Sequence, residues 1–312
     1  MFEHNGYKYY SDKETLLGVK HDKNTPTYLY KYYSLSENSV NALTQLYVYA
    51  SHPAQLNDPL DCNVKMIKFD DEAYMKVLAQ GLYEQIKFIY ENEEERMQFY
   101  QTAYQYIIYS KCGILSMAEN DNNINLWATY TNNEGFCVEF DFAKFGFKFY
   151  GPYPINYSDS IKPVKLSKVG VREAMAYQTN VKTMDWAQEK EWRIIIPSKE
   201  GDDFNLWGPG TKHINNCFHG SSRCIKYQLC AIKSIILAYK FFSDDETTKI
   251  SDTEKEVCIK NELKNTLIDF VIRIGKPIKI VEVKDLNSIK VQTIKIIKLG
   301  VDTYRIICNK TD

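Results

Sequence analysis

The sequence predicts an α+β fold built on a mixed, largely antiparallel sheet with a helical insertion. Segments with the alternation or the β-branched and aromatic content of strands recur along the chain. Segments of helical period stand among them without the regular strand–helix alternation of parallel proteins. A length of 312 residues with 44% apolar residues suits one domain, so we expect residues 1–312 to form a single unit.

Strand signals begin with the aromatic run YLYKYY and continue through the apolar run that ends WRIII. Proline, glycine and asparagine bound most of these runs, as expected where strands give way to turns. The expected strands cover residues 28–33, 46–51, 111–119, 135–142, 185–196, 230–239, 270–282, 289–297 and 304–308.

Helix signals are of three kinds. Ser34 and Glu37 have capping-box spacing ahead of apolar positions at helical spacing. Residues 70–109 repeat apolar side chains with a period near 3.6 and predict a helical insertion of two or three helices. Further helices are expected at residues 123–131, 169–179 and 244–264, the last of them in an α/β tail from about residue 240 to residue 312.

The overall charge does not indicate a nucleic-acid-binding protein, because the formal net charge is −1. The two halves differ, with 13 Lys and Arg against 20 Asp and Glu in residues 1–150, and 26 against 20 in residues 151–312. Such an asymmetry fits either a face for a polyanion or a dipolar molecule with solvated lysines. The basic later half leaves a nucleic acid open as a partner.

The compartment is predicted from what the sequence lacks. No apolar run approaches the roughly 18 residues of a membrane span, and the first residues have no apolar signal-peptide core. Eight cysteines are scattered without paired spacing, as expected of reduced, mostly buried thiols. We therefore expect a cytoplasmic protein without a membrane partner.

The run DWAQEKEWRIII places charged side chains on a strand expected to enter the core. Side chains alternate along a strand, so Glu189, Glu191 and Arg193 share one face while Trp192 takes the other. The face could be a solvent-exposed ladder of ion pairs, each worth at most about 1 kcal/mol. It could equally line a cleft in which one carboxylate stabilises positive charge on a reacting sugar and the other positions or deprotonates an acceptor.

Polar and aromatic side chains elsewhere are candidates for ligand contacts. In LNDPLD, Asn57, Asp58 and Asp61 follow a strand end, where they either build the turn or bind ribose hydroxyls or other polar groups. Trp127 and Tyr130 stand three apart on one helical face, where they either pack in the core or form a wall for a flat ring.

Metal and phosphate motifs are missing from the sequence. No G-x-G-x-x-G, Walker or G-x-S-x-G pattern occurs. His213, Cys217, His219 and Cys224 are residue types that zinc accepts, but their spacing matches none of the common zinc patterns. No metal is expected.

Four stretches together resemble a widespread bacterial family catalogued only as a domain of unknown function. They are YLYKYYSL, LYVYASHPAQLNDPLDC, GILSMAENDNNINLWATYTNNEGFCVEFDF and WAQEKEWRIII, in this order within about residues 28–240. Two positions depart from the family pattern: Tyr33 replaces the Arg that closes the first motif, and Leu126 replaces a Met. The first departure puts any role of that Arg in doubt.

The order of parts is also similar to that of ADP-ribosyltransferases, including the poly-ADP-ribosyltransferase type and toxins that modify nucleic acid. This resemblance implies an ADP-ribosyltransferase-like core that takes NAD as a substrate. In such enzymes a polar residue on the first strand holds a ribose, aromatics sandwich the nicotinamide, and a Glu on a late strand is catalytic. These roles would fall on Lys31 or Tyr32, on Tyr49 or Tyr130, and on Glu191 or Glu189, respectively.

The functional expectation is an NAD-consuming ADP-ribosyltransferase-like enzyme, as a toxin or anti-phage effector. Its acceptor would be a nucleic acid or a protein, and an antitoxin or other inhibitory partner is expected because such activity harms the producing cell. The alternatives are a non-enzymatic nucleotide- or partner-binding module, and a metal-dependent nuclease. The nuclease would use Asp58, Asp61, Glu189 and Glu191.

Overall fold

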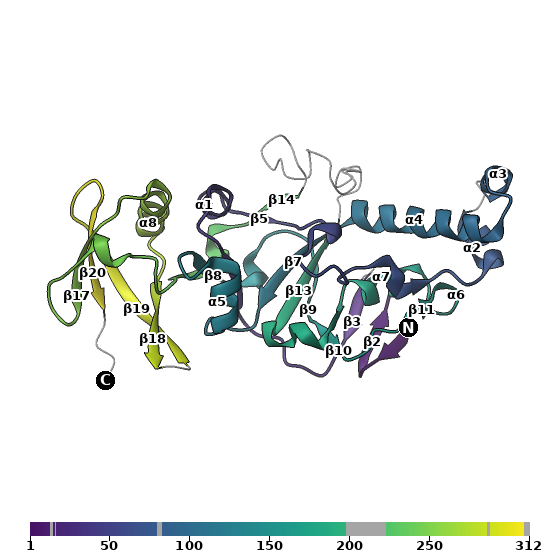
Figure 1. The fold of residues 1–312 in the computed structure, drawn as a ribbon, viewed down its shortest axis with the longest axis horizontal. Helices are drawn as coiled ribbons and strands as arrows, with labels where there is room; N and C mark the ends of the chain where they lie inside the picture. The colour runs from purple at the N-terminus through teal and green to yellow at the C-terminus, as the bar shows by residue number, and fades with distance from the viewer. Residues whose placement is uncertain (13–14, 16, 80–82, 198–222, 286–287, 309–312) are drawn as a thin grey trace.

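The computed structural model describes residues 1–12, 15, 17–79, 83–197, 223–285 and 288–308. It has the predicted α+β architecture, in which one mixed sheet of eleven strands runs through the molecule (Figure 1). From one edge to the other its strands are β16 (Thr247–Lys249), β17 (Glu254–Cys258), β20 (Thr303–Cys308), β19 (Ser288–Lys298), β18 (Ile278–Asp285), β15 (Ile232–Leu237), β8 (Phe136–Phe140), β4 (Leu29–Tyr33), β7 (Cys112–Ala118), β13 (Glu191–Pro197) and β9 (Tyr150–Pro154).

The order of the central strands differs from their order in the chain. Strand β4 is the first of the sheet in sequence and lies between β8 and β7, antiparallel to both. Strand β13 comes late in the sequence and pairs antiparallel with β7, so that Glu191 stands opposite Ala118 and Arg193 opposite Ser116. Only β7 therefore separates the first strand from the late strand that begins at Glu191.

The tail joins the core through the same sheet. Strand β18 pairs in parallel with β15, and Ile278 stands opposite Ile235. In Figure 1 the tail occupies one end of the molecule, and the helical insertion with the N-terminal strands occupies the other. The remaining paired strands are β1 (Phe2–His4), β2 (Tyr7–Tyr10), β3 (Gly18–Lys20), β5 (Tyr47–Tyr49), β6 (Ile67–Lys68), β10 (Asn156–Ser158), β11 (Val164–Lys165), β12 (Val181–Thr183) and β14 (Cys224–Lys226).

The helices of the core and of the insertion lie near the positions that the apolar period predicts. Helix α5 begins after Asn123, whose side chain accepts the backbone N–H groups of Asn125 and Leu126, and it ends at Asn132 in the left-handed region. The helices are α1 (Glu37–Thr44), α2 (Glu72–Ala79), α3 (Tyr83–Ile89), α4 (Glu93–Lys111), α5 (Ile124–Thr131), α6 (Leu166–Val169), α7 (Val171–Gln178) and α8 (Glu262–Ile274), and the 3-10 turns are η1 (Pro53–Gln55), η2 (Val64–Met66), η4 (Phe142–Lys144), η5 (Met184–Glu189), η6 (Leu229–Ala231) and η7 (Asp244–Glu246).

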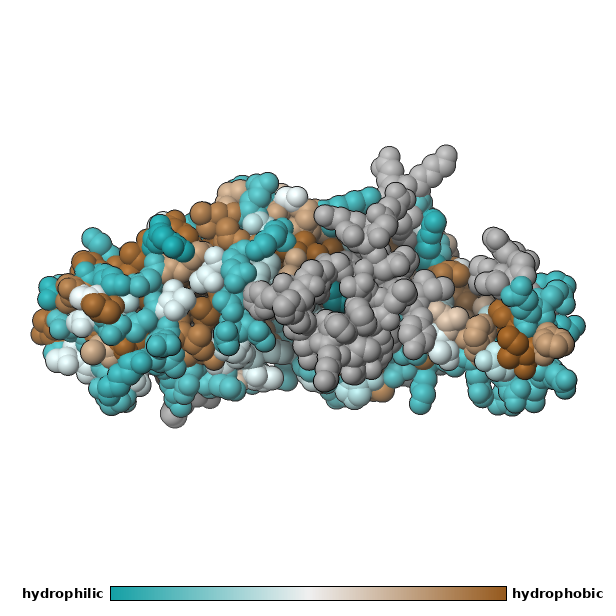
Figure 2. Space-filling view, turned by 90° about the horizontal axis from the view of Figure 1, so that it is seen from above, coloured by the Kyte–Doolittle hydropathy of each residue, from teal (hydrophilic) through white to brown (hydrophobic). Residues whose placement is uncertain are grey.

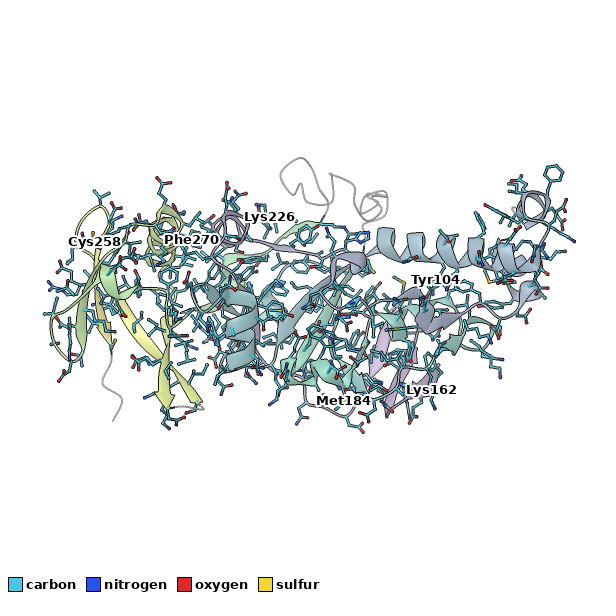
Figure 3. The ribbon with its side chains drawn as sticks, in the orientation of Figure 1. Tyr104, Lys162, Met184, Lys226, Cys258 and Phe270 are labelled. Atoms are coloured by element: carbon cyan, nitrogen blue, oxygen red, sulfur yellow. The ribbon has the colours of Figure 1, made fainter. Side chains whose placement is uncertain are left out.

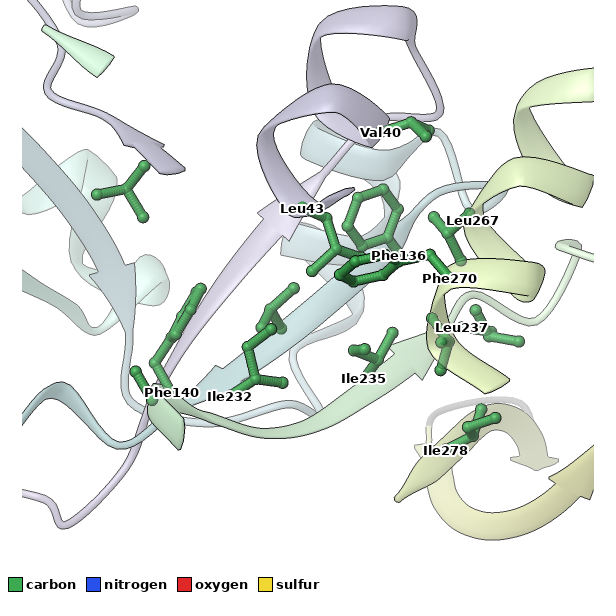
Figure 4. Close-up of a cluster of buried hydrophobic side chains, with 14 of the residues drawn as sticks. Val40, Leu43, Phe136, Phe140, Ile232, Ile235, Leu237, Leu267, Phe270 and Ile278 are labelled. Atoms are coloured by element: carbon green, nitrogen blue, oxygen red, sulfur yellow. The ribbon is translucent and has the colours of Figure 1, made fainter. Parts of the chain in front are cut away.

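Three clusters of buried apolar side chains pack against the sheet in the part of the chain that the structure describes, the smallest of them around Trp127. In the largest one, α1 and α8 pack together over β8 and β15, and Val40, Phe136 and Leu267 converge there (Figure 4). The second lies toward the helical insertion and includes Tyr104 of α4, whereas Phe270 belongs to the first (Figure 3).

On the face in Figure 2, apolar residues are scattered among hydrophilic ones. In the part of the chain that the structure describes, no helix is long and apolar enough to cross a membrane.

The structure corrects two expectations for the tail. The charged segment predicted as a helix at residues 244–264 holds η7, β16 and β17, because β17 pairs with β16 on one side and β20 on the other. The apolar run predicted as a strand from residue 270 is the end of α8, which is capped by Asn261 and stops at Gly275 in the left-handed region. Sheet pairing overrides helical propensity in the first segment. Two capping residues define the helix in the second.

Two local expectations also shift. The first helix is capped by Ser36, whose side chain accepts the backbone N–H of Ser39, and not by Ser34. The late strand begins at Glu191 and not near Asp185, because residues 184–189 form the turn η5 and Lys190 takes a left-handed conformation with φ 45°. Glu189 thus precedes the strand that carries Glu191 and Arg193.

Candidate functional site

A cavity of about 240 Å³ opens where β4, β7 and β13 meet the LNDPLD turn. Strand β4 contributes Lys31 and Tyr32 to the lining of the cavity, and the LNDPLD turn contributes Asn57. Helix α5 contributes Tyr130, and the late segment contributes Glu189, Glu191 and Arg193. Residues predicted from distant parts of the sequence are therefore brought together around one space.

The floor of this cavity is built on Arg193, whose side chain is 1% exposed. Its Nη1 and Nη2 donate to the two carboxylate oxygens of Asp61 at 2.9 and 2.8 Å. Its Nε and Nη2 donate to Oε1 of Glu191 at 3.0 and 2.8 Å. One planar guanidinium thus holds two buried carboxylates in a fixed geometry, as its fork of donors allows.

A second buried cation, Lys182 of β12, completes the floor. Its Nζ donates to Oε2 of Glu189 at 2.9 Å and to Oε2 of Glu191 at 3.1 Å, and lies 3.9 Å from Asp61. The same Nζ stands 4.7 Å from the ring centroid of Trp186 in η5, a cation–π contact. Burial alone would lower the pKa of Lys182, but the surrounding carboxylates raise it, so the lysine stays charged.

The LNDPLD turn holds the network at both ends. Asn57 donates from Nδ2 to the hydroxyl of Tyr130 at 2.8 Å, and that hydroxyl donates to Oε1 of Glu189 at 2.6 Å. Asp61, at the other end of the turn, accepts from Arg193. A continuous path of hydrogen bonds therefore runs from the turn through Tyr130 and Glu189 to the late strand, and back to the turn.

The two glutamates differ in how fully their oxygens are used. Glu191 accepts two bonds from Arg193 on Oε1 and one from Lys182 on Oε2. Burial would raise its pKa, but the charges of Arg193 and Lys182 and these hydrogen bonds lower it to about 2. Glu189 accepts one bond on each oxygen from the described residues. Glu189 therefore keeps more acceptor capacity for a ligand than Glu191 does.

Lys31 is the third cation at the cavity. Its Nζ donates to the carbonyl of Ser116 at 3.3 Å and lies 5.6 Å from the ring centroid of Tyr33. Among the described residues, no carboxylate stands within the 4 Å of an ion pair. Burial lowers the pKa of Lys31 to about 8, against a smaller opposing effect of Glu191. Lys31 thus offers donors to a ligand in the cavity.

Three predicted residues are not part of the cavity lining. Trp127 is 2% exposed, and its ring meets Tyr32 edge-on at 5.0 Å, so it supports a lining residue from behind. Tyr49 donates its hydroxyl to Oε1 of Gln55, which itself lines the cavity. Asp58 is buried and its Oδ1 accepts the backbone N–H of Leu60, the turn-building role of such residues.

Sequence reasoning missed Lys182 and Ser116, whereas Asp61 was a candidate both in the LNDPLD turn and in the nuclease alternative. Lys182 stands between Val181 and Thr183 in a three-residue strand, without a motif around it. Its burial follows from β12 pairing with β10 and from the carboxylates that reach it. Ser116 has the one signal that was readable, because it is the polar residue of the apolar strand CGILSMA.

The donor set at the cavity pairs carboxylates with cations. Within the described ranges, no group of three or more His, Cys, Asp or Glu is arranged to hold a metal ion. Lys182 and Arg193 occupy the space between the three carboxylates. His213, Cys217 and His219 lie outside the described residues, and Cys224 stands in β14 opposite Tyr49.

Comparison with protein families adds one match. Residues 126–194 match the family model DUF2971, a protein of unknown function. This match confirms the resemblance to a family of unknown function, and the resemblance to ADP-ribosyltransferases stays a prediction. The DUF2971 segment holds Tyr130, Lys182, Glu189, Glu191 and Arg193. No curated protein and no solved structure matches the chain significantly.

Proposed function

We propose that this protein is an NAD-consuming, ADP-ribosyltransferase-like enzyme and that the cavity is its active site. One observation carries the proposal, which is that four predicted residues line the same cavity. They are Lys31 of β4, Tyr130 of α5, Glu189 of η5 and Glu191 of β13. These are the residue types and the chain order that the ADP-ribosyltransferase resemblance assigns to ribose binding, nicotinamide contact and catalysis.

The charge balance of the floor supports this chemistry. Three carboxylates, Asp61, Glu189 and Glu191, form ion pairs with two cations, Lys182 and Arg193, so the ion-paired cluster holds one carboxylate in excess. Lys31 adds a third cation to the cavity lining outside these ion pairs. Cleavage of the nicotinamide–ribose bond passes through an oxocarbenium-like state. A fixed negative charge stabilises that positive state more than the ground state, which accelerates the reaction.

The two glutamates would divide the work. Glu189 has unused acceptor capacity and the more exposed side chain, 10% against 5% for Glu191, so it would contact a ribose hydroxyl. Glu191 would hold Lys182 and Arg193 in place and add its charge from behind. Lys31 would donate to the ligand, and Tyr130 would both hold Glu189 and contact the nicotinamide ring.

The cavity suits one end of the dinucleotide. At about 240 Å³ it is smaller than the roughly 300–1,000 Å³ of most ligand sites, so it would enclose the nicotinamide ribose and leave the adenosine outside. The acceptor would be a macromolecule, nucleic acid or protein, as for a toxin or anti-phage effector. Such an enzyme needs an antitoxin or another inhibitory partner in the cell that makes it.

The deciding experiment measures nicotinamide released from NAD by the pure protein, by Glu189→Gln and by Glu191→Gln. A matched control is Glu246→Gln, because Glu246 is also a buried, lysine-paired carboxylate, in the tail. We expect Glu189→Gln to lose at least about 100-fold in kcat with little change in thermal stability, a loss of about 2.7 kcal/mol. Glu191→Gln should lose both activity and stability, and Glu246→Gln should keep wild-type activity.

The outcomes also separate the alternatives. No release of nicotinamide by the wild type, with NAD binding retained, would favour a non-enzymatic binding module. Nucleic-acid cleavage that requires magnesium or manganese would favour the nuclease. Glu189→Gln keeping more than a tenth of the activity would remove Glu189 from the catalytic role.

A further inference from the structure

Tyr30 of β4 lines the cavity beside Lys31 and Tyr32, although no sequence pattern singled it out. Its hydroxyl donates to Oε1 of Glu139 at 3.1 Å. Register places Tyr30 directly opposite both Ala118 of β7 and Glu139 of β8. The orientation of this wall of the cavity therefore depends on a carboxylate outside the cavity lining.

Glu139 is itself held by donors from three other strands. It is 5% exposed, and its Oε2 accepts from the hydroxyl of Ser234 in β15 and, at 2.9 Å, from Nζ of Lys279 in β18. Burial would raise the pKa of Glu139, but the hydrogen bonds of Ser234 and Lys279 and the charge of Lys279 lower it. The carboxylate is therefore ionised at neutral pH and accepts hydrogen bonds on both oxygens.

The cation of this cluster comes from the tail. Parallel pairing of β15 with β18 sets Lys279 opposite Ile236, so its side chain reaches across β15 to Glu139 of β8. Lys279 is the ion-pair partner of Glu139, and its side chain is 24% exposed. A residue of the tail is thus connected by two hydrogen bonds to the hydroxyl of a cavity-wall tyrosine.

We infer that Lys279, acting through Glu139, is a positioning residue that holds Tyr30 as a rigid wall of the cavity. The tail then contributes a residue that supports the wall of the cavity. The contact with Tyr30 is independent of any ligand, and its effect on NAD rests on the function proposed above.

The physical consequence follows from removing the cation. Without Lys279, Glu139 keeps only neutral donors in a buried place, so its ionised form becomes costly. The carboxylate would turn toward water or take up a proton, and Tyr30 would lose its fixed acceptor. A ligand would then have to order the side chain on binding, which weakens affinity by the cost of immobilising one side chain. KM should rise, and kcat should change little because Tyr30 touches no reacting group.

The test uses the full chain with 3-fluorotyrosine at position 30 and the variants Lys279→Met, Lys279→Arg and Lys298→Met. Lys298 is the matched control, since it is a tail lysine paired with Asp269 at 2.6 Å, distant in the sheet from β4. Fluorine NMR reports the environment of Tyr30 without any ligand, and steady-state kinetics with NAD give KM and kcat. Glu139→Gln probes the same contact should Lys279→Met fail to fold.

We expect the fluorine resonance to shift or broaden in Lys279→Met, to return in Lys279→Arg, and to stay unchanged in Lys298→Met. KM for NAD should rise roughly 2- to 10-fold in Lys279→Met with kcat preserved. An unchanged resonance in Lys279→Met, or the same change in Lys298→Met, overturns the inference. A wild-type protein that does not cleave NAD sinks the proposed function, while the fluorine spectra still decide the role of Lys279.

Discussion

The described residues hold several buried clusters of carboxylates and lysines, and two of them, at the cavity and at the turn η7 of the tail, are built differently. At the cavity, Lys182 meets Glu189, Glu191 and Asp61, and Arg193 adds a second cation. In the tail, Lys264 pairs with Glu246 at 3.3 Å, and the described residues offer Lys264 no second carboxylate. The tail pair is matched in charge, and the cavity cluster has a carboxylate in excess.

The carboxylates of the two clusters, Glu246 and Glu189, also differ in what surrounds them. Glu246 closes a capping box with Ser243 and accepts the backbone N–H of Lys260, so its oxygens hold the turn η7 and the segment between β17 and α8. Glu189 faces open space and keeps acceptor capacity. A buried ion pair is by itself weak evidence for function, because its desolvation cost can exceed its attraction. The informative feature is a carboxylate that lines a cavity and keeps acceptor capacity.

The largest expected effect comes from breaking the cavity cluster at Arg193. Arg193→Met should lower the free energy of unfolding by about 3–5 kcal/mol, because Asp61 and Glu191 would remain buried without their main partner. Urea denaturation followed by fluorescence measures the change. The matched control is Arg96→Met in the helical insertion, which removes a buried arginine paired with Glu72.

Arg96→Met should leave the release of nicotinamide unchanged, whereas Arg193→Met should abolish it at a temperature where the variant is folded. If Arg193→Met and Arg96→Met lose the same free energy of unfolding and release nicotinamide at the same rate, the cavity cluster has only a structural role, as the ion pair in the insertion has.

The second prediction concerns acid. The pKa of Glu191 is about 2 in the folded protein, below its usual value of 4.5. A depressed pKa adds stability that is present above the unfolded value and is lost as the pH falls through the folded value. The free energy of unfolding should therefore fall between about pH 4.5 and pH 2, by up to about 3 kcal/mol.

The acid effect is measured by urea denaturation at several pH values in wild type and in Glu191→Gln. The variant has no carboxylate to titrate at this position, so its curve should be flatter over the same range. Parallel curves would show that Glu191 is not held ionised by Arg193 and Lys182.

The contrast between the clusters also shows what the sequence could predict. The fold class and the central strands were predictable, because YLYKYY, CGILSMA and WRIII carry the strand signal locally. Lys31, Glu189 and Glu191 were candidates from residue type and order. Lys182 was not, because its burial is created by three carboxylates that reach it from other segments.

The aromatic candidates show the same limit. Trp127 and Tyr130 share a helical face, and sequence alone cannot separate a ligand wall from core packing. In the structure each residue takes one of the two roles. Trp127 packs against Tyr32, and Tyr130 lines the cavity and holds Glu189. The difference arises from how α5 is docked on β4, which depends on the whole sheet.

The smallest expected effect comes from the tail cluster. Glu246→Gln keeps the shape of the side chain and removes only its charge, so the bonds from Ser243 and Lys264 lose strength without leaving a cavity. Hydrogen bonds to charged groups are worth about 1.5–3 kcal/mol, and part of this remains with the amide oxygen, so the free energy of unfolding should fall by only about 1–2 kcal/mol. Urea denaturation and the nicotinamide assay measure both consequences on one sample. Activity should equal that of the wild type, because Glu246 lies in the tail and does not line the cavity. A loss of activity as large as that of Glu189→Gln would end the distinction between a functional and a structural cluster, and would assign the tail pair to the site as well.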